Sequence, residues 1–232
     1  MIENNFQRCL FDCCVYHKDV KDGSKIYLLL YVDDMLIACK HMDQIDALKK
    51  QLKGSFEIKD LGEAKKILGV ELIRNRKNGT LVLSQQRYIK KVLEKFEMGR
   101  SKPVLTPLPA HFKLSSQQCP KIDAERVEMS SIPYSSAVGC LMYAMILTRL
   151  VMSYAVSMVN RYTVDPGKEH WKAVVWILRY LNGTMNYGLA YRADKGKEVN
   201  VEGFVDSDYA RDLDKRRSLT RYLFKLNGCT IN

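Results

Sequence analysis

The strongest constraint on this chain is a short apolar stretch interrupted by two adjacent acids. Residues 25–40 read KIYLLLYVDDMLIACK, so apolar runs from Ile26 to Tyr31 and from Met35 to Ala38 flank Asp33 and Asp34. Ile, Val, Leu and Tyr favour strands, and runs this short are typical of buried ones. Because charged residues avoid burial unless they are paired or bind metal, the pattern predicts a tight turn that holds two carboxylates at the rim of a core.

On the residues alone, two interpretations of this turn stay open. Carboxylates supply the oxygen ligands that Mg²⁺ prefers, so the pair could hold a metal ion. Asp is also a common turn residue, and a polar hairpin tip needs no function.

The charge balance points to a polyanionic partner. Lysine and arginine number 37 against 26 aspartate and glutamate residues, which gives a net charge of +11 and a pI near 9.3. An excess of this size is typical of proteins that bind nucleic acid, although a basic surface can also serve solubility alone. Hydrophobic residues make up 47% and charged residues 27%, as in an ordinary globular protein.

The cysteines and one apolar stretch bear on the compartment. The chain has 7 cysteines with no Cys-x-x-Cys pair and no zinc spacing, and no signal peptide is apparent, which fits a reducing compartment. The stretch Ala137–Val159 is long enough to span a membrane, but Arg149 near its middle would be costly there. We expect no membrane partner, and two buried helices that meet near Arg149.

Hydrophobic periodicity predicts a sheet covered by a helix at the start of the chain. A strand is expected over residues 11–17, and a turn at Asp22-Gly23 leads into the two apolar runs, so that the three segments form an antiparallel sheet. A helix is expected over residues 43–53. Its apolar stripe comprises Ile45, Leu48 and Leu52.

The next segment predicts a hairpin followed by a basic helix. Asn78-Gly79 is expected to join a strand over 67–73, with Gly69 inside it, to a strand over 80–83. Ser84 is placed to cap a helix over 85–96. The apolar face of this helix comprises Ile89, Val92, Leu93 and Phe96, and its other side carries Arg87, Lys90, Lys91 and Lys95. These cations either contact phosphates or form a merely solvated face.

Composition changes in the second half. Five of the 6 prolines lie between residues 99 and 133, which predicts an extended or partly disordered linker. Helical spacing predicts two helices over 134–160 and a third that begins at residue 167 or 168 and ends at Leu181, before Asn182-Gly183. Strands are expected over 201–208 and 219–226.

Four blocks of this sequence resemble one family. The tetrad Tyr31-Val32-Asp33-Asp34 and its apolar flanks look like the Tyr-x-Asp-Asp hairpin in the palm of reverse transcriptases, in the version of copia-type LTR retrotransposons. The text from Asp60 to Met98 resembles the part of those enzymes that follows. The connection region of the family is similar to PYSSAVGCLMYAM and PGKEHWKAVVWILRYLNGT, and the first strands of its RNase H domain are similar to VEGFVDSDYARDLDKRRS.

The resemblance implies an α+β fold and a division into four parts. Residues 1–98 would be the C-terminal part of the palm, with its antiparallel sheet and helices, and a thumb-like helix. Residues 99–133 would be a linker and 134–198 a helical connection. Residues 199–232 would be the truncated start of an RNase H-like domain.

The resemblance also implies roles for individual residues. Asp33 would be a direct ligand in a two-Mg²⁺ site for nucleotidyl transfer, with Asp34 its neighbour. Tyr31 would pack beside the primer end and Val32 against the nascent duplex. Residues near the primer grip would be Leu68, Gly69, Val70 and Glu71. Asp206 matches the first active-site aspartate of RNase H, with Asp208 nearby. Partners implied are an RNA template, an RNA–DNA hybrid and a deoxynucleoside triphosphate, in the cytoplasm or nucleus.

The missing third carboxylate predicts that the chain alone does not polymerise DNA, since in the family it lies well upstream of the Tyr-x-Asp-Asp, before the first residue of this sequence. Other departures suggest a decayed copy or altered packing. The family usually has Thr-Arg-Pro-Asp-Ile where Thr148-Arg149 is followed by Leu150, and Arg211 and Arg221 stand where it has glycine. The alternatives are a non-catalytic basic remnant that binds nucleic acid through phosphates and the translation of a decayed insertion without function.

Overall fold

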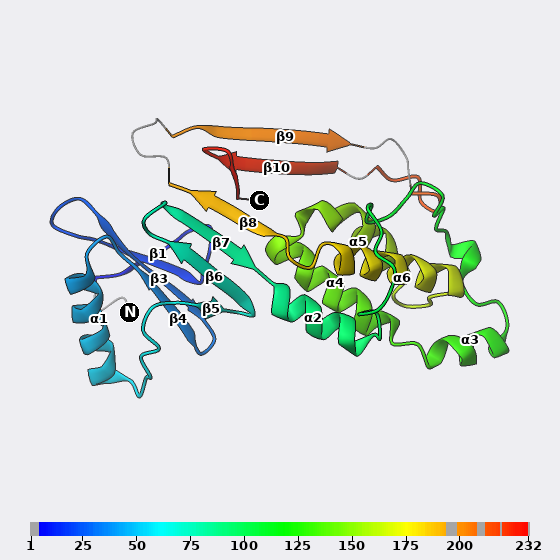
Figure 1. Ribbon diagram of the computed structural model, residues 1–232, viewed down its shortest axis with the longest axis horizontal. Helices are drawn as coiled ribbons and strands as arrows, with labels where there is room; N and C mark the ends of the chain where they lie inside the picture. Colours follow the sequence, from blue (N-terminus) through cyan, green and yellow to red (C-terminus); the bar gives the residue numbers. More distant parts are fainter. Residues whose placement is uncertain (1–4, 194–198, 208–211, 219, 232) are drawn as a thin grey trace. The chain divides into compact units, whose positions relative to one another are not determined.

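In the computed structural model, antiparallel sheets and helices form an α+β fold in two compact units, residues 1–67 and 68–232 (Figure 1). The structure describes residues 5–193, 199–207, 212–218 and 220–231, apart from the side chain of Arg221. The helix after the second hairpin packs into the core of the second unit.

The first unit is a four-stranded antiparallel sheet, in the order β1-β2-β3-β4, with one helix. Its core comprises Phe6, Ile26, Leu28, Leu48 and Leu52. Its elements are β1 (Gln7–Arg8), β2 (Val15–Asp19), β3 (Lys25–Tyr31), β4 (Asp34–Ala38), α1 (Met42–Ser55) and the short β5 (Lys66–Ile67). The expected helix and its stripe are confirmed, since Leu48 and Leu52 are buried and Ile45 is half-buried.

Two details of this sheet differ from the prediction. The strand expected from residue 11 begins only at Val15, because residues 12–14 form a turn and Phe11 is almost fully exposed. The strand β3 is buried on one face rather than on both. Ile26 and Leu28 face the core, whereas Tyr27 is exposed on the other side.

The second unit contains a hairpin, a helical core and a second sheet. The first sheet has β6 (Val70–Asn75), β7 (Thr80–Ser84) and β8 (Gly188–Arg192), and the second has β9 (Val201–Ser207), β10 (Thr220–Leu226) and β11 (Cys229–Thr230), all antiparallel. The helices are α2 (Gln86–Lys95), α3 (Asp123–Ser130), α4 (Tyr134–Thr148), α5 (Ser153–Asn160) and α6 (Lys168–Gly183), with 3₁₀ turns η2 (Ser116–Gln118) and η3 (Leu150–Met152). The helix pair α4 and α5, with Arg149 at their junction, confirms the expected break.

The proline-rich segment is not an extended linker. Leu114 is buried, and side chains of α6 donate hydrogen bonds to its backbone: Trp176 Nε1 to the Thr106 carbonyl (3.0 Å) and Arg179 Nε to the Lys102 carbonyl (2.8 Å). Carbonyl groups without a strand or helix partner must find another donor, and α6 supplies it here. The segment therefore belongs to the packed helical unit.

The lengths and composition of the helices bear on membrane spanning. Among the residues described, no single helix is long and apolar enough to cross a bilayer. In the same part of the chain, α3 and α4 taken together, which are bent by 52°, meet that criterion.

Candidate functional site

The two acids lie where the sequence predicts them, at the tip of the β3–β4 hairpin. Tyr31 pairs with Asp34 in the antiparallel register, so Val32 and Asp33 form a two-residue loop. Val32 has a φ of 52°, which is a genuine outlier for a β-branched residue. The turn therefore stores backbone strain directly beside the acids.

The side chains of this tip are open to solvent. Val32 is 81% exposed and Tyr31 is 48% exposed, and Asp33 and Asp34 are both exposed. Asp33 belongs to the loop, whereas Asp34 is the first residue of β4. The two carboxylates thus have different backbone environments and are not equivalent.

The predicted primer-grip residues form a turn and the start of a strand. Leu68 and Gly69 have φ values of 46° and 73° and precede β6, so Gly69 is not inside a strand as expected. The hydroxyl of Tyr143, on α4, donates a hydrogen bond to the Leu68 carbonyl. Val70 is buried, and Glu71 is the next residue of β6. The hairpin itself is confirmed, with the loop 76–79 joining β6 to β7.

The basic side of α2 is partly neutralised. Arg87 Nε lies 2.7 Å from a Glu71 carboxylate oxygen, so the structure joins a predicted phosphate contact to a predicted grip residue. Lys95 Nζ donates to Ser136 Oγ (2.8 Å), and Lys90 lies 3.9 Å from Glu94. Lys91 is exposed. Ser84 accepts a hydrogen bond from the Gln86 amide (3.2 Å), and α2 begins at Gln86.

Asp206 lies in β9, opposite Arg221 in the register with β10. Every residue of β9 is exposed, and Asp206 is among them. Asp208 and Arg211 lie outside the described residues, so their predicted roles stay predictions.

Comparisons with known proteins decide the family. The family model described as reverse transcriptase (RNA-dependent DNA polymerase) matches residues 1–110. The chain is 47% identical, over its full length, to 17% of the retrovirus-related Pol polyprotein from transposon TNT 1-94 of Nicotiana tabacum. It is 36% identical to an uncharacterized mitochondrial protein of Arabidopsis thaliana, over 89% of this chain and 80% of that protein. It is also 30% identical to a putative transposon Ty5-1 protein of Saccharomyces cerevisiae, over 94% of this chain and 67% of that protein.

The chain belongs to the copia-type retrotransposon reverse transcriptases. The chain spans about a sixth of the tobacco polyprotein, 17% of its length. No solved structure matches it. The comparisons support a fragment of the reverse transcriptase region and do not favour the alternative, a non-catalytic basic remnant that binds nucleic acid.

The β3–β4 hairpin fits a hard cation only in part. Asp33 and Asp34 offer exposed carboxylate oxygens, which are the donors that Mg²⁺ prefers. Among the side chains that the structure describes, no third His, Cys, Asp or Glu lies close enough to complete a cluster with them.

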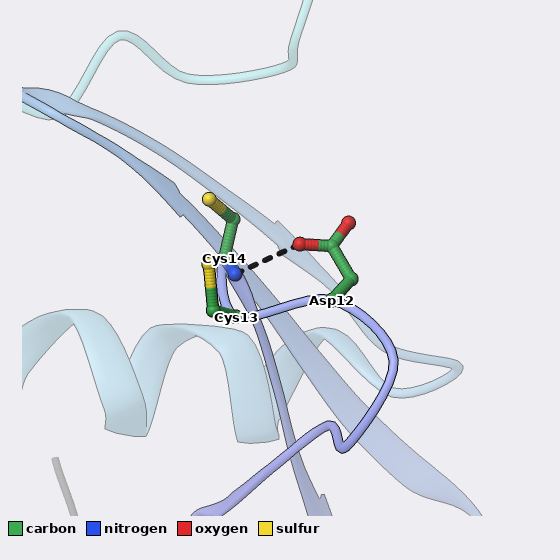
Figure 2. A group of neighbouring side chains, drawn as sticks. All are labelled: Asp12, Cys13 and Cys14. Carbon is green, nitrogen blue, oxygen red and sulfur yellow. Dashed lines mark hydrogen bonds between the residues drawn. The ribbon is translucent and has the colours of Figure 1, made fainter.

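A different cluster of possible metal ligands was missed by the sequence reasoning. Asp12, Cys13 and Cys14 present one carboxylate and two thiols within 4.8 Å of one another (Figure 2). Partial burial, and then the neighbouring Cys13 and Asp12, raise the pKa of the Cys14 thiol. Adjacent cysteines match no established zinc spacing, so the pattern was overlooked in the sequence.

A buried polar chain at the junction of α4 and α5 was also unforeseen. Arg149 is buried, and its Nη atoms donate to Thr148 Oγ1 (3.0 Å) and to the carbonyls of Thr184 (3.1 Å) and Met185 (3.3 Å). Thr148 Oγ1 donates in turn to Gln85 Oε1 (2.6 Å). These contacts connect α2, α4 and the C-terminal end of α6, so Arg149 has a structural role.

Proposed function

We propose that this segment supplies, within its parent polyprotein, two palm carboxylates and the primer-positioning turn of an RNA-directed DNA polymerase. The observation that carries the proposal is the β3–β4 hairpin, in which a two-residue loop presents Asp33 and Asp34 to solvent. The family match over residues 1–110 supports it. The palm and thumb names for residues 1–98 belong to this proposal.

The two acids have distinct tasks in this proposal. Asp33, in the loop, would be a direct ligand of Mg²⁺, and Asp34, at the start of β4, would add negative charge beside it. Mg²⁺, when bound, would lower the pKa of a primer hydroxyl and offset charge on the nucleotide phosphates. Tyr31 and Val32, the other two residues of the tip, would lie against the primer end and the duplex.

The primer grip and the basic helix have supporting roles. The turn at Leu68 and Gly69, held by Tyr143, would lie against the primer backbone. Lys91 and the other exposed cations of α2 would contact phosphates of an RNA–DNA hybrid, with Arg87 doing so in competition with Glu71. Asp206 would be the first carboxylate of an RNase H site.

The isolated chain is proposed to be inactive in polymerisation. Two-metal transfer needs enough carboxylates to organise both ions, and the described residues place only two at the tip. In a primer-extension assay with an RNA template and Mg²⁺, the chain is expected to give no product. Clear extension would refute this part of the proposal.

Metal binding tests the hairpin more directly. Isothermal titration with Mn²⁺, a substitute for Mg²⁺ at oxygen sites, is expected to show weak binding to the chain and none to Asp33→Asn. The matched control is Asp46→Asn, which removes one exposed charge from α1 of the same unit and is expected to bind like the unchanged chain. Equal heats from the two variants would show that Asp33 is not a ligand.

A further inference from the structure

We propose that Asp12, Cys13 and Cys14 form a binding site for a thiophilic divalent cation of the zinc class. The site lies in the turn between β1 and β2, and the palm hairpin uses none of its residues. Its donor set, two thiols and one carboxylate, differs in kind from the all-oxygen pair at Asp33 and Asp34. The proposal is therefore independent of the polymerase assignment.

The backbone of the turn is fixed before any ion binds. The Cys14 amide donates to Asp12 Oδ1 (2.9 Å), which orients the carboxylate, and the Val15 amide donates to the Asp12 carbonyl (3.1 Å). Arg8 Nε donates to the Cys13 carbonyl (2.9 Å), and the Leu30 amide of β3 donates to the Cys14 carbonyl (2.8 Å). These hydrogen bonds hold the turn against β1 and β3. Because the backbone of the turn is already ordered, little backbone entropy is lost when its side chains bind an ion.

The donor positions suit a tetrahedral ion. The three possible ligand atoms already lie within 4.8 Å of one another, and Figure 2 shows both sulfur atoms on one side of the turn. Two sulfurs bound to Zn²⁺ at about 2.3 Å lie about 3.8 Å apart, so side-chain rotation alone can close the site. Both thiols and the carboxylate are at least partly accessible, and water can fill the fourth position.

Binding of the cation releases protons from the two thiols. Each thiol loses its proton to solvent as its sulfur forms a bond to the ion, so two protons leave for each divalent cation that binds. Thiolates select soft or borderline ions such as Zn²⁺ and Cd²⁺ over Mg²⁺, which prefers oxygen. The site and the palm hairpin therefore take different metals from the same solution.

Titration of the reduced full chain with Cd²⁺ tests the site, followed by the ultraviolet absorbance of sulfur–cadmium bonds. One equivalent of Cd²⁺ is expected to saturate the absorbance band, at the intensity of two thiolate–cadmium bonds. Cys13→Ser and Cys14→Ser should each lose about half of that band and bind at least about tenfold more weakly. Asp12→Asn should weaken binding and keep the band.

The control is Cys39→Ala, which removes a thiol of the same unit outside the cluster. It is expected to titrate like the unchanged chain, and circular dichroism establishes that each variant stays folded. A band that persists in both Cys13→Ser and Cys14→Ser, or the absence of a saturating band in the unchanged chain, would overturn the proposal. Retention of Mn²⁺ binding in Asp33→Asn would contradict the proposed palm site and leave the Cd²⁺ titration unaffected, so the two proposals fail separately.

Discussion

At the scale of single residues, the strained backbone at Val32 is the most informative feature of the tip. A non-glycine residue at positive φ costs about 1–3 kcal/mol, and a β-branched side chain makes the position worse. Val32 buries little of its side chain to offset that cost, since it is 81% exposed. The strain is consistent with a turn whose shape is set by the acids it presents rather than by stability.

Val32→Gly is expected to raise the free energy of unfolding by about 1 kcal/mol. Glycine adopts positive φ without strain. The free energy gained by relieving the strain exceeds the cost of the extra entropy that glycine gives the unfolded chain. Urea unfolding of the full chain, followed by circular dichroism, measures the change.

The control for Val32 is Val151→Gly in η3, an exposed valine with negative φ. The free energy of unfolding of this control is expected to fall by about 0.5–1 kcal/mol, because glycine there relieves no strain and only adds entropy to the unfolded chain. Destabilisation by both variants would mean that Val32 is not strained.

At the scale of elements, local patterns in the sequence identified the pieces that depend on neighbours in the chain. The β3–β4 hairpin, α1 and the face of α2 that contains Ile89 follow from apolar spacing and turn residues. The strand β8 was missed, because its pairing with β7 joins Leu189 to Leu83, which are far apart in sequence. The burial of Leu114 was missed for the same reason, since its partners lie on distant helices.

The N-terminus of α6 contains a histidine that is held in its neutral form. His170 is buried; its Nδ1 accepts a hydrogen bond from the Gly167 amide (2.9 Å), and its Nε2 donates to the Ser115 carbonyl (3.1 Å). Burial lowers the pKa of His170, and the Ser115 carbonyl and the acids Asp214, Glu169 and Asp165 only partly oppose this. Protonation of Nδ1 would also remove the acceptor for Gly167 and place a positive charge at a helix N-terminus.

Stability should therefore fall on acidification through the titration of His170. Its folded-state pKa lies below the unfolded value, so its contribution is complete above about pH 6.5 and is lost as the pH drops toward the folded-state value. The slope is at most about 1.4 kcal/mol per pH unit. Urea unfolding at a series of pH values from about 7.5 to about 5.5, which spans about one unit on either side of the ordinary histidine pKa, measures the loss.

His170→Gln should abolish this pH dependence, whereas His111→Gln should retain it. His111 is exposed and lies against Phe112 and Trp176 at the surface of α6, so it serves as a matched histidine. An unchanged slope in His170→Gln would assign the acid sensitivity to other groups.

At the scale of the whole molecule, the sequence predicted the family and the tip of the candidate site, but not which distant elements share one core. The expected thumb helix α2 shares its core with α4 and α6, because Ile89 and Leu93 pack with Leu141 and Ile177. Such a core is a property of the assembled chain, and no window of sequence contains it. The Asp12 cluster was missed for a different reason: its three residues are consecutive, but adjacent cysteines match no established zinc spacing.

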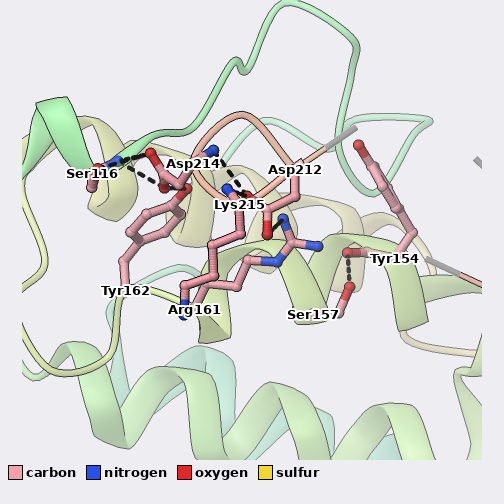
Figure 3. A network of polar contacts seen from close by, with 8 residues as sticks. All are labelled: Ser116, Tyr154, Ser157, Arg161, Tyr162, Asp212, Asp214 and Lys215. Atoms are coloured by element: carbon pink, nitrogen blue, oxygen red, sulfur yellow. Dashed lines mark hydrogen bonds and ion pairs between the residues drawn. The ribbon is translucent and has the colours of Figure 1, made fainter. Parts of the chain in front are cut away.

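The connection from β9 to β10 is fastened to the helical core of the second unit by two acids. Asp214 accepts hydrogen bonds from the Ser116 amide (2.9 Å), from Ser116 Oγ (2.8 Å) and from the Tyr162 hydroxyl (3.0 Å) (Figure 3). Asp212 forms an ion pair with Arg161 (3.3 Å). Although burial opposes ionisation, the hydrogen bonds from Ser116 and Tyr162 outweigh it and hold the pKa of Asp214 below its ordinary value.

Asp214→Asn is expected to lower the free energy of unfolding by about 2 kcal/mol, because an amide group replaces an acceptor oxygen where three donors converge. Hydrogen exchange at the Ser116 amide should accelerate in the same variant, which locates the effect at this contact. The matched control, Asp123→Asn, alters a fully solvated acid 3.3 Å from Arg126 and is expected to change stability by less than about 0.5 kcal/mol. Equal effects of the two substitutions would mean that the β9–β10 connection does not depend on Asp214. The β9–β10–β11 sheet would then be held within the second unit mainly by contacts with other strands, such as the hydrogen bond from the Arg192 amide of β8 to Cys229 Sγ of β11 (3.4 Å).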